Sequence, residues 1–119
     1  MNLQLGFTMP ADKLDKGGRS TYVTNLNRAL DLITGHFDSA WMIDHLQFGD
    51  ADVLEGFTAL TYMAALHPRL KFGHTVLCPS FRNPALLAKM GATLHITVLL
   101  LPCAVTEYGL PPCQVALSP

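Results

Sequence analysis

Short apolar runs alternate with longer stretches of helical periodicity through the first 95 residues of the sequence, and this alternation restricts the fold more than any other feature. Three runs are brief, β-prone and bounded by polar or turn-forming residues, which is typical of buried strands: Leu3–Thr8, Ser39–Ile43 and Lys71–Cys78. Three stretches carry apolar residues at helical spacing: 21–35, 53–66 and 85–94. Strands that alternate with helices of this length form right-handed βαβ units, so the sequence predicts a parallel sheet.

The ends of the three predicted helices carry capping signals. Thr21 is the predicted N-cap of the first helix, and Asp52 with Glu55 three residues later forms a predicted capping box for the second. Asn83 followed by Pro84 matches an N-cap with proline at the first helical position of the third. These signals support three separate helices.

The last part of the chain differs in composition from the rest. Every Lys and Arg, and every acidic residue except Glu107, lies before residue 90. The run Ile96–Leu101 is short, β-prone and followed by proline, so it predicts a fourth strand. We therefore expect an organised part over residues 1–95 and a divergent, apolar, proline-containing tail over residues 96–119.

Two α/β architectures fit this pattern. A doubly wound nucleotide-binding fold usually carries a G-x-G-x-x-G turn after its first strand, and residues 6–10 contain none. A (β/α)8 barrel needs about 250 residues and carries its active site at the carboxyl ends of its strands. The chain has 119 residues, so it would supply only part of such a barrel.

Composition narrows the classes of partner. Eight basic residues against nine acidic ones argue against a nucleic-acid partner. No stretch approaches the roughly 20 apolar residues of a membrane helix, and the first residues lack the features of a signal peptide. The three cysteines form no C-x-x-C pair, which argues against a disulfide framework or a zinc site. We therefore expect a cytoplasmic chain with reduced cysteines and no membrane partner.

The polar pair Asp44-His45 directly follows the apolar run Ser39–Ile43. Parallel folds place their reacting groups at the carboxyl ends of the strands, and histidine suits proton transfer there. The alternative is that Asp44 caps a turn and His45 faces solvent. The motifs H-E-x-x-H, G-x-S-x-G and G-x-x-x-x-G-K-[ST] are missing, so the sequence predicts no metal site and no standard nucleophile.

A second candidate site follows the run Lys71–Cys78, in which His74 and Thr75 interrupt apolar residues. Arg82 comes just before a predicted helix N-terminus, where anions bind, so it either binds phosphate or pairs with a nearby carboxylate. Cys78 is either a small buried hydrophobe or a contact to a ligand.

Three segments carry a resemblance to a known family: Phe37–His45 (FDSAWMIDH), Leu70–Val76 (LKFGHTV) and Phe81–Lys89 (FRNPALLAK). In this order and spacing the sequence resembles the luciferase-like monooxygenase superfamily, which includes bacterial luciferase and flavin- and deazaflavin-dependent oxidoreductases. The resemblance implies the N-terminal half of a TIM barrel. It also implies hydride transfer or oxygen insertion on a small organic substrate, with FMN or a deazaflavin coenzyme of the F-420 type.

The resemblance assigns site residues as well. It places His45 beside the reactive ring of the cofactor, where it holds or moves a proton, with Asp44 as its neighbour in the pocket. It implies a non-prolyl cis peptide bond at Thr75-Val76 that supports the cofactor ring. The implied cofactor-binding residues are Thr75, Val76, Cys78 and Arg82.

The sequence departs from the family pattern after the third predicted helix. Where the family continues into a glycine-rich fourth strand, this chain reads Leu94–Leu100 (LHITVLL), and strands five to eight are missing. Three hypotheses follow. The chain is a truncated flavin-dependent oxidoreductase, a catalytically inactive fragment, or a half-barrel subunit that acts as a binding or structural partner and forms a homo-oligomer to close its open sheet edges.

Overall fold

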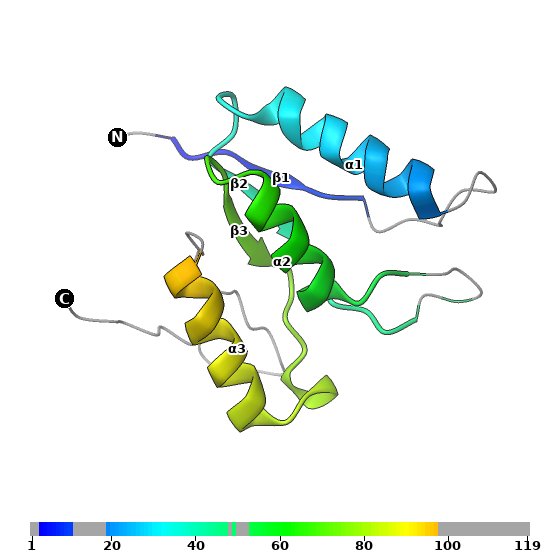
Figure 1. The fold of residues 1–119 in the computed structure, drawn as a ribbon, viewed down its shortest axis with the longest axis vertical. Helices are drawn as coiled ribbons and strands as arrows, with labels where there is room; N and C mark the ends of the chain where they lie inside the picture. The colour runs from blue at the N-terminus through cyan, green and yellow to red at the C-terminus, as the bar shows by residue number, and fades with distance from the viewer. Residues whose placement is uncertain (1–2, 11–18, 48, 50–52, 98–119) are drawn as a thin grey trace.

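The computed structural model describes residues 3–10, 19–47, 49 and 53–97. Strands and helices alternate along this part of the chain (Figure 1). The elements are β1 (Gly6–Thr8), α1 (Arg19–Ile33), β2 (Ser39–Met42), α2 (Gly56–Leu66), β3 (Lys71–His74), the single 3-10 turn η1 (Pro79–Phe81) and α3 (Pro84–Thr97). The predicted alternation of three strands with three helices is confirmed.

The three strands form one parallel sheet in the order β1-β2-β3. Ala40 in the middle strand lies opposite Phe7 on one side and Phe72 on the other. In Figure 1, α1 and α3 lie at opposite ends of the molecule, with α2 between them. This mixed α/β arrangement with a parallel sheet is compatible with part of a TIM barrel.

One face of the sheet packs against helices. Side chains alternate between the two faces of a strand, so Ala40 and Met42 share a face with Phe72 of the neighbouring strand. These side chains are buried together with Leu30 of α1 and Leu60 of α2 in one apolar core. Burial of this shared face gives the sheet and both helices a common source of stability.

The opposite face of the sheet carries the only tryptophan of the chain. A Cβ atom at Gly6 would lie 2.6 Å from Nε1 of Trp41, and one at Gly73 would lie 2.7 Å from its ring. The indole therefore spans the neighbouring strands, and it donates a hydrogen bond of 3.0 Å to Oγ of Ser39. Glycine is required on both sides because any larger residue would occupy the space of the ring.

The first two helices begin at other residues than the capping signals predict. α1 begins at Arg19, so Thr21 lies inside the helix and is not its N-cap. α2 begins after Glu55, whose own carboxylate accepts the N–H groups of Phe57 and Thr58 and caps the helix. The predicted capping box is therefore wrong, because its Glu is the N-cap itself.

The third helix confirms one capping prediction and contradicts the strand prediction at Ile96 and Thr97. Oδ1 of Asn83 accepts the N–H groups of Ala85 at 3.0 Å and Leu86 at 3.3 Å, as the sequence predicts. Ile96 and Thr97, however, are the last residues of α3, where the hydroxyl of Thr97 donates to the carbonyl oxygen of Thr93 at 3.1 Å and the continuing helix overrides the local β-propensity. The rest of the predicted fourth strand and tail, residues 98–119, lies outside the described residues. Among the described helices, none has the length and apolar character to cross a bilayer.

Candidate functional site

The carboxyl ends of β2 and β3 bring several sequence-predicted residues together. The side chain of Asp44, just after β2, is fully buried. Nη1 and Nη2 of Arg82 donate to its two carboxylate oxygens at 2.6 and 2.7 Å, and the N–H of Cys78 donates to Oδ2 at 3.0 Å. Asp44 thus holds the segment after β3 against the end of β2.

Arg82 has a second carboxylate partner and an aromatic neighbour. Its Nη2 also donates to Oε1 of Glu55, the N-cap of α2. Its guanidinium carbon lies 5.7 Å from the centre of the Phe57 ring, within the range of a cation–π contact. We call Arg82, Asp44, Glu55 and Phe57 the Arg82 clamp. The clamp joins the end of β2, the start of α2 and the segment between η1 and α3.

The charges in the clamp stabilise one another. Burial by itself would raise the pKa of Asp44, but the hydrogen bonds from Arg82 and from the Cys78 N–H outweigh it and leave that pKa below its ordinary value. Burial also opposes ionisation of Glu55, yet the bonds from Thr58 and Arg82 lower its pKa to about 2. The hydrogen bond to Asp44 raises the pKa of Arg82. All three groups are therefore charged at neutral pH.

A buried histidine lies beside the clamp. His74 ends β3 with 3% of its surface exposed, and its ring stacks on Phe57 with 5.8 Å between the ring centres. Its Nδ1 lies 3.2 Å from the carbonyl oxygen of Met42, while Nε2 is buried and has no hydrogen-bond partner among the described residues. Burial lowers the pKa of His74, and the charge of Asp44 partly opposes that shift. The sequence shows only that His74 interrupts an apolar strand.

Acidification should destabilise the fold over a pH range that the pKa of His74 sets. Its pKa in the folded chain lies below the ordinary 6.5, so the unfolded chain binds a proton that the folded chain does not. The stability linked to the uncharged His74 should therefore be fully present above pH 6.5 and should be lost as the pH drops toward the folded pKa. For one proton, the free energy of unfolding falls by at most about 1.4 kcal/mol per pH unit in this range. Glu55 adds a loss only at lower pH, between its ordinary 4.5 and about 2.

Urea denaturation of the wild type and of His74→Asn, between about pH 7.5 and 5, measures this loss. The Asn side chain keeps an N–H near the carbonyl of Met42 but does not titrate. We expect a flatter pH dependence for His74→Asn and an unchanged one for the control His36→Asn, whose histidine is exposed. Equal slopes in all three proteins would show that His74 is not the source.

His45 lies at the rim of the same sheet edge. Its side chain is exposed. A small hollow of about 10 Å³, with room for about one water molecule, lies beside it. The residues that line this hollow are Tyr22, Met42, Ile43, His45, Val53 and Leu54. His45 therefore borders an apolar depression at the carboxyl end of β2, while the neighbouring Asp44 is buried beneath the surface.

The segment after β3 contains the cis peptide bond that the resemblance implies. The bond between Thr75 and Val76 is cis, as predicted. The N–H of Thr75 donates to the carbonyl of Met42 at 2.9 Å, which ties this segment to the end of β2. The side chain of Val76 is exposed, at 37% of its surface, and Cys78 is a half-buried free cysteine. The segment thus presents apolar surface close to its anchor on β2.

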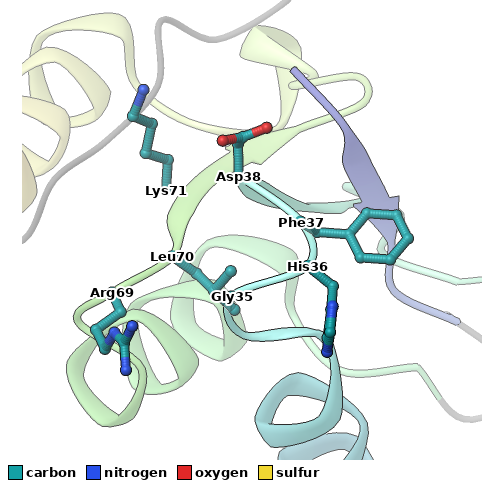
Figure 2. Close-up of a pocket in the computed structure, with 7 residues that line it drawn as sticks. All are labelled: Gly35, His36, Phe37, Asp38, Arg69, Leu70 and Lys71. Carbon is teal, nitrogen blue, oxygen red and sulfur yellow. The ribbon is translucent and has the colours of Figure 1, made fainter. Parts of the chain in front are cut away.

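A second, wider hollow lies at the other end of the sheet (Figure 2). It has a volume of about 300 Å³ and is lined by residues 35–38, just before β2, and by residues 69–71, which lead into β3 and include its first residue. Figure 2 shows the side chains of Arg69 and Lys71 pointing away from each other. Oδ2 of Asp38 there accepts the N–H of Leu5 at 2.8 Å. Parallel folds carry their chemistry at the carboxyl ends of the strands, so this hollow is not the candidate site.

The described residues fit one part of a flavin-type cofactor better than another. A flat ring system needs apolar and aromatic surface, which half-buried Trp41 and exposed Val76 offer. A phosphate needs cationic donors, but both terminal nitrogens of Arg82 already donate to carboxylates. Among residues 3–10, 19–47, 49 and 53–97, no group of three or more His, Cys, Asp or Glu side chains is arranged to hold a metal ion.

A sequence model of a protein family described as luciferase-like monooxygenase matches residues 7–98, which include all the elements described above except the first residue of β1. No curated protein matches the chain. The matched region includes every residue of the Arg82 clamp, together with His45 and the cis peptide segment.

Proposed function

The chain belongs to the luciferase-like monooxygenase family, and from this premise we propose that it binds a flavin-type cofactor at the carboxyl ends of β2 and β3. The family suggests a flavin-type oxidoreductase. When bound, such a cofactor supplies the hydride-transfer or oxygen-insertion chemistry that acts on a small organic substrate, and the protein supplies binding and orientation. FMN and a deazaflavin coenzyme of the F-420 type are both candidates for the cofactor.

The proposed roles follow from exposure and contacts. The exposed imidazole of His45 holds or moves a proton beside the reactive ring. The Thr75-Val76 segment, with its exposed Val76 side chain, supports the ring, and Cys78 lines the same pocket. Asp44 is fully buried, so we assign it the task of holding this edge together and not direct contact with the cofactor.

One observation carries this proposal: the residue pair after β2 and the cis peptide segment after β3 are joined at the carboxyl edge of a parallel sheet. Residues 7–98 match the family, so this edge is the part of the chain where the family's cofactor chemistry is expected.

Cofactor binding can be tested through the only tryptophan of the chain, Trp41. Its half-buried indole lies on the sheet face that α1 and α2 do not cover, so a ring bound at that edge should quench its fluorescence. Titration of the protein with FMN, and separately with the F-420-type coenzyme, should give saturable quenching with at least one of them. No saturable change with either compound would contradict the proposal.

A matched pair of variants locates the binding surface. Val76→Asp introduces a charge where the ring is proposed to lie and should weaken binding at least about tenfold, which corresponds to about 1.4 kcal/mol. Leu32→Asp makes the same kind of change at an exposed apolar residue on α1 and should leave affinity unchanged. Equal affinities for the two variants would place the cofactor elsewhere.

An unpaired sheet edge supports a second candidate function, that of a half-barrel subunit. Within the described part of the chain, β1 and β3 each pair only with β2, so each has one edge without a partner strand. Such edges pair readily with another chain. A homo-oligomer that closes the sheet would appear as a dimer or larger species in sedimentation velocity, whereas a monomer over the whole concentration range would count against this function.

A further inference from the structure

We propose that Arg82 is a positioning residue that fixes His45 and the Thr75-Val76 segment relative to each other, and that it does not bind a phosphate of the cofactor. The inference rests on the proposed function, because it concerns the same site. It replaces the cofactor contact that the sequence resemblance implies for Arg82 with a role exerted through its neighbours.

The hydrogen bonds of Arg82 are directed inward. Its two terminal nitrogens engage both oxygens of Asp44, and Nη2 also engages Glu55. The planar guanidinium fork matches a carboxylate in this two-point geometry, which Lys cannot reproduce. Only 10% of the Arg82 side chain is exposed. The guanidinium is therefore held against the protein and presents little surface to a ligand.

The local charge also disfavours a phosphate. The single cation of the clamp faces the two carboxylates Asp44 and Glu55, both of which are ionised at neutral pH. The cluster therefore carries net negative charge. A phosphate that approached Arg82 would have to displace a carboxylate from it and would meet repulsion from both.

The contacts of the clamp lead directly to the two functional segments. Asp44 is the residue before His45, and it accepts the N–H of Cys78, two residues after Val76. The start of α2 also lies close to Asp44, because a Cβ atom at Gly56 would lie 3.0 Å from Oδ1 of Asp44. If Arg82 were lost, the buried carboxylate would have no cationic partner, and both segments would lose their common anchor.

Paired ligands distinguish positioning from phosphate binding. Affinities for FMN and for riboflavin, which lacks the phosphate, are measured for the wild type, Arg82→Lys and Arg82→Gln, with Arg28→Gln as a control at an exposed arginine of α1. We expect both affinities to fall at least about tenfold in the Arg82 variants, with an unchanged ratio between the two ligands, and no change in the control. A loss confined to FMN, or no loss for either ligand, would overturn the proposal.

A measurement without cofactor keeps the two proposals separate. In nuclear magnetic resonance spectra of the free protein, Arg82→Lys should shift the His45 ring signals and the Val76 and Cys78 amide signals, while Arg28→Gln should not. If the wild type binds neither FMN nor riboflavin, the affinities give no comparison, and these spectra alone decide the role of Arg82: unshifted signals overturn it. The proposed function itself fails only if the F-420-type coenzyme does not bind either. If Arg82→Gln does not fold, which circular dichroism shows, the Lys variant carries the comparison, since it keeps the charge.

Discussion

Replacing Asp44 by Ala is expected to lower the free energy of unfolding by about 3 to 5 kcal/mol, because it removes one partner of a buried ion pair. The change leaves the N–H of Cys78 without its acceptor and Arg82 with Glu55 alone. For a domain whose total stability is about 5 to 15 kcal/mol, this loss removes a large part of the folded population. Urea denaturation followed by circular dichroism measures it.

An exposed aspartate provides the control for that experiment. Asp31 lies 3.4 Å from His67, but three quarters of its side chain is exposed, at 75%. Solvent screens such a pair, so Asp31→Ala should change the free energy of unfolding by less than about 1 kcal/mol. If Asp44→Ala and Asp31→Ala were equally stable, the Arg82 clamp would contribute little to folding, and its proposed positioning role would lose its basis.

Two glycine-to-alanine substitutions are expected to have opposite effects. A Cβ atom at Gly56 would lie 2.8 Å from the carbonyl oxygen of Ile43, a backbone atom that cannot move away by a rotamer change. Gly56→Ala should therefore cost about 1 to 3 kcal/mol through overpacking. Gly91 lies inside α3 with nothing within 4 Å of its Cβ position, so Gly91→Ala should stabilise the helix by about 0.5 to 1 kcal/mol.

Thermal and urea denaturation of the two alanine variants, side by side, test this contrast. The cost at Gly56 arises where the start of α2 meets the residues after β2, so this variant should also weaken cofactor binding, whereas Gly91→Ala should not. A Gly56→Ala protein as stable as Gly91→Ala would mean that α2 tolerates a shift away from Asp44. The close approach would then not be needed to build the site.

Helix capping depends mainly on residues close together in the sequence, so the sequence can predict part of it. Asn83 caps α3 as predicted because the signal lies within a few residues of the N–H groups that it satisfies. The sequence around Glu55 predicts a partner in a capping box, but Glu55 is the cap itself. Both its roles need only local geometry, but Arg82, 27 residues away, also binds its carboxylate and so contributes to its position.

The strand predicted over Ile96–Leu101 shows the opposite case. β-prone composition favours a strand for this run in isolation, yet Ile96 and Thr97 continue α3. The hydroxyl of Thr97 donates to the carbonyl oxygens of Thr93 and Leu94, one turn earlier in the helix. A propensity difference of a few tenths of a kcal/mol per residue is too small to end a helix whose earlier turns have formed, because each further residue adds a hydrogen bond.

For the candidate site, the sequence predicts which segments contribute residues but does not predict which of these residues contact one another. That Asp44-His45 follows a buried strand, and that Thr75-Val76 follows the next, can be predicted from apolar runs and turn residues. The sequence is compatible with two kinds of partner for Arg82, a phosphate and a carboxylate. The structure brings it against Asp44, 38 residues away in the chain. Nothing in the local sequence around His74 indicates that its Nε2 would be buried with no hydrogen-bond partner in the part of the chain that the structure describes.

The sequence by itself determined the alternation of strands and helices, the parallel sheet and the family, because each depends on the spacing of apolar residues and on short motifs within one segment. Only the tertiary structure decided which charges meet at the carboxyl edge, which of them are buried, and which side chains remain exposed to a ligand. Those outcomes depend on desolvation and Coulomb interactions between residues that are distant in the chain, and such energies exist only once the segments are packed together.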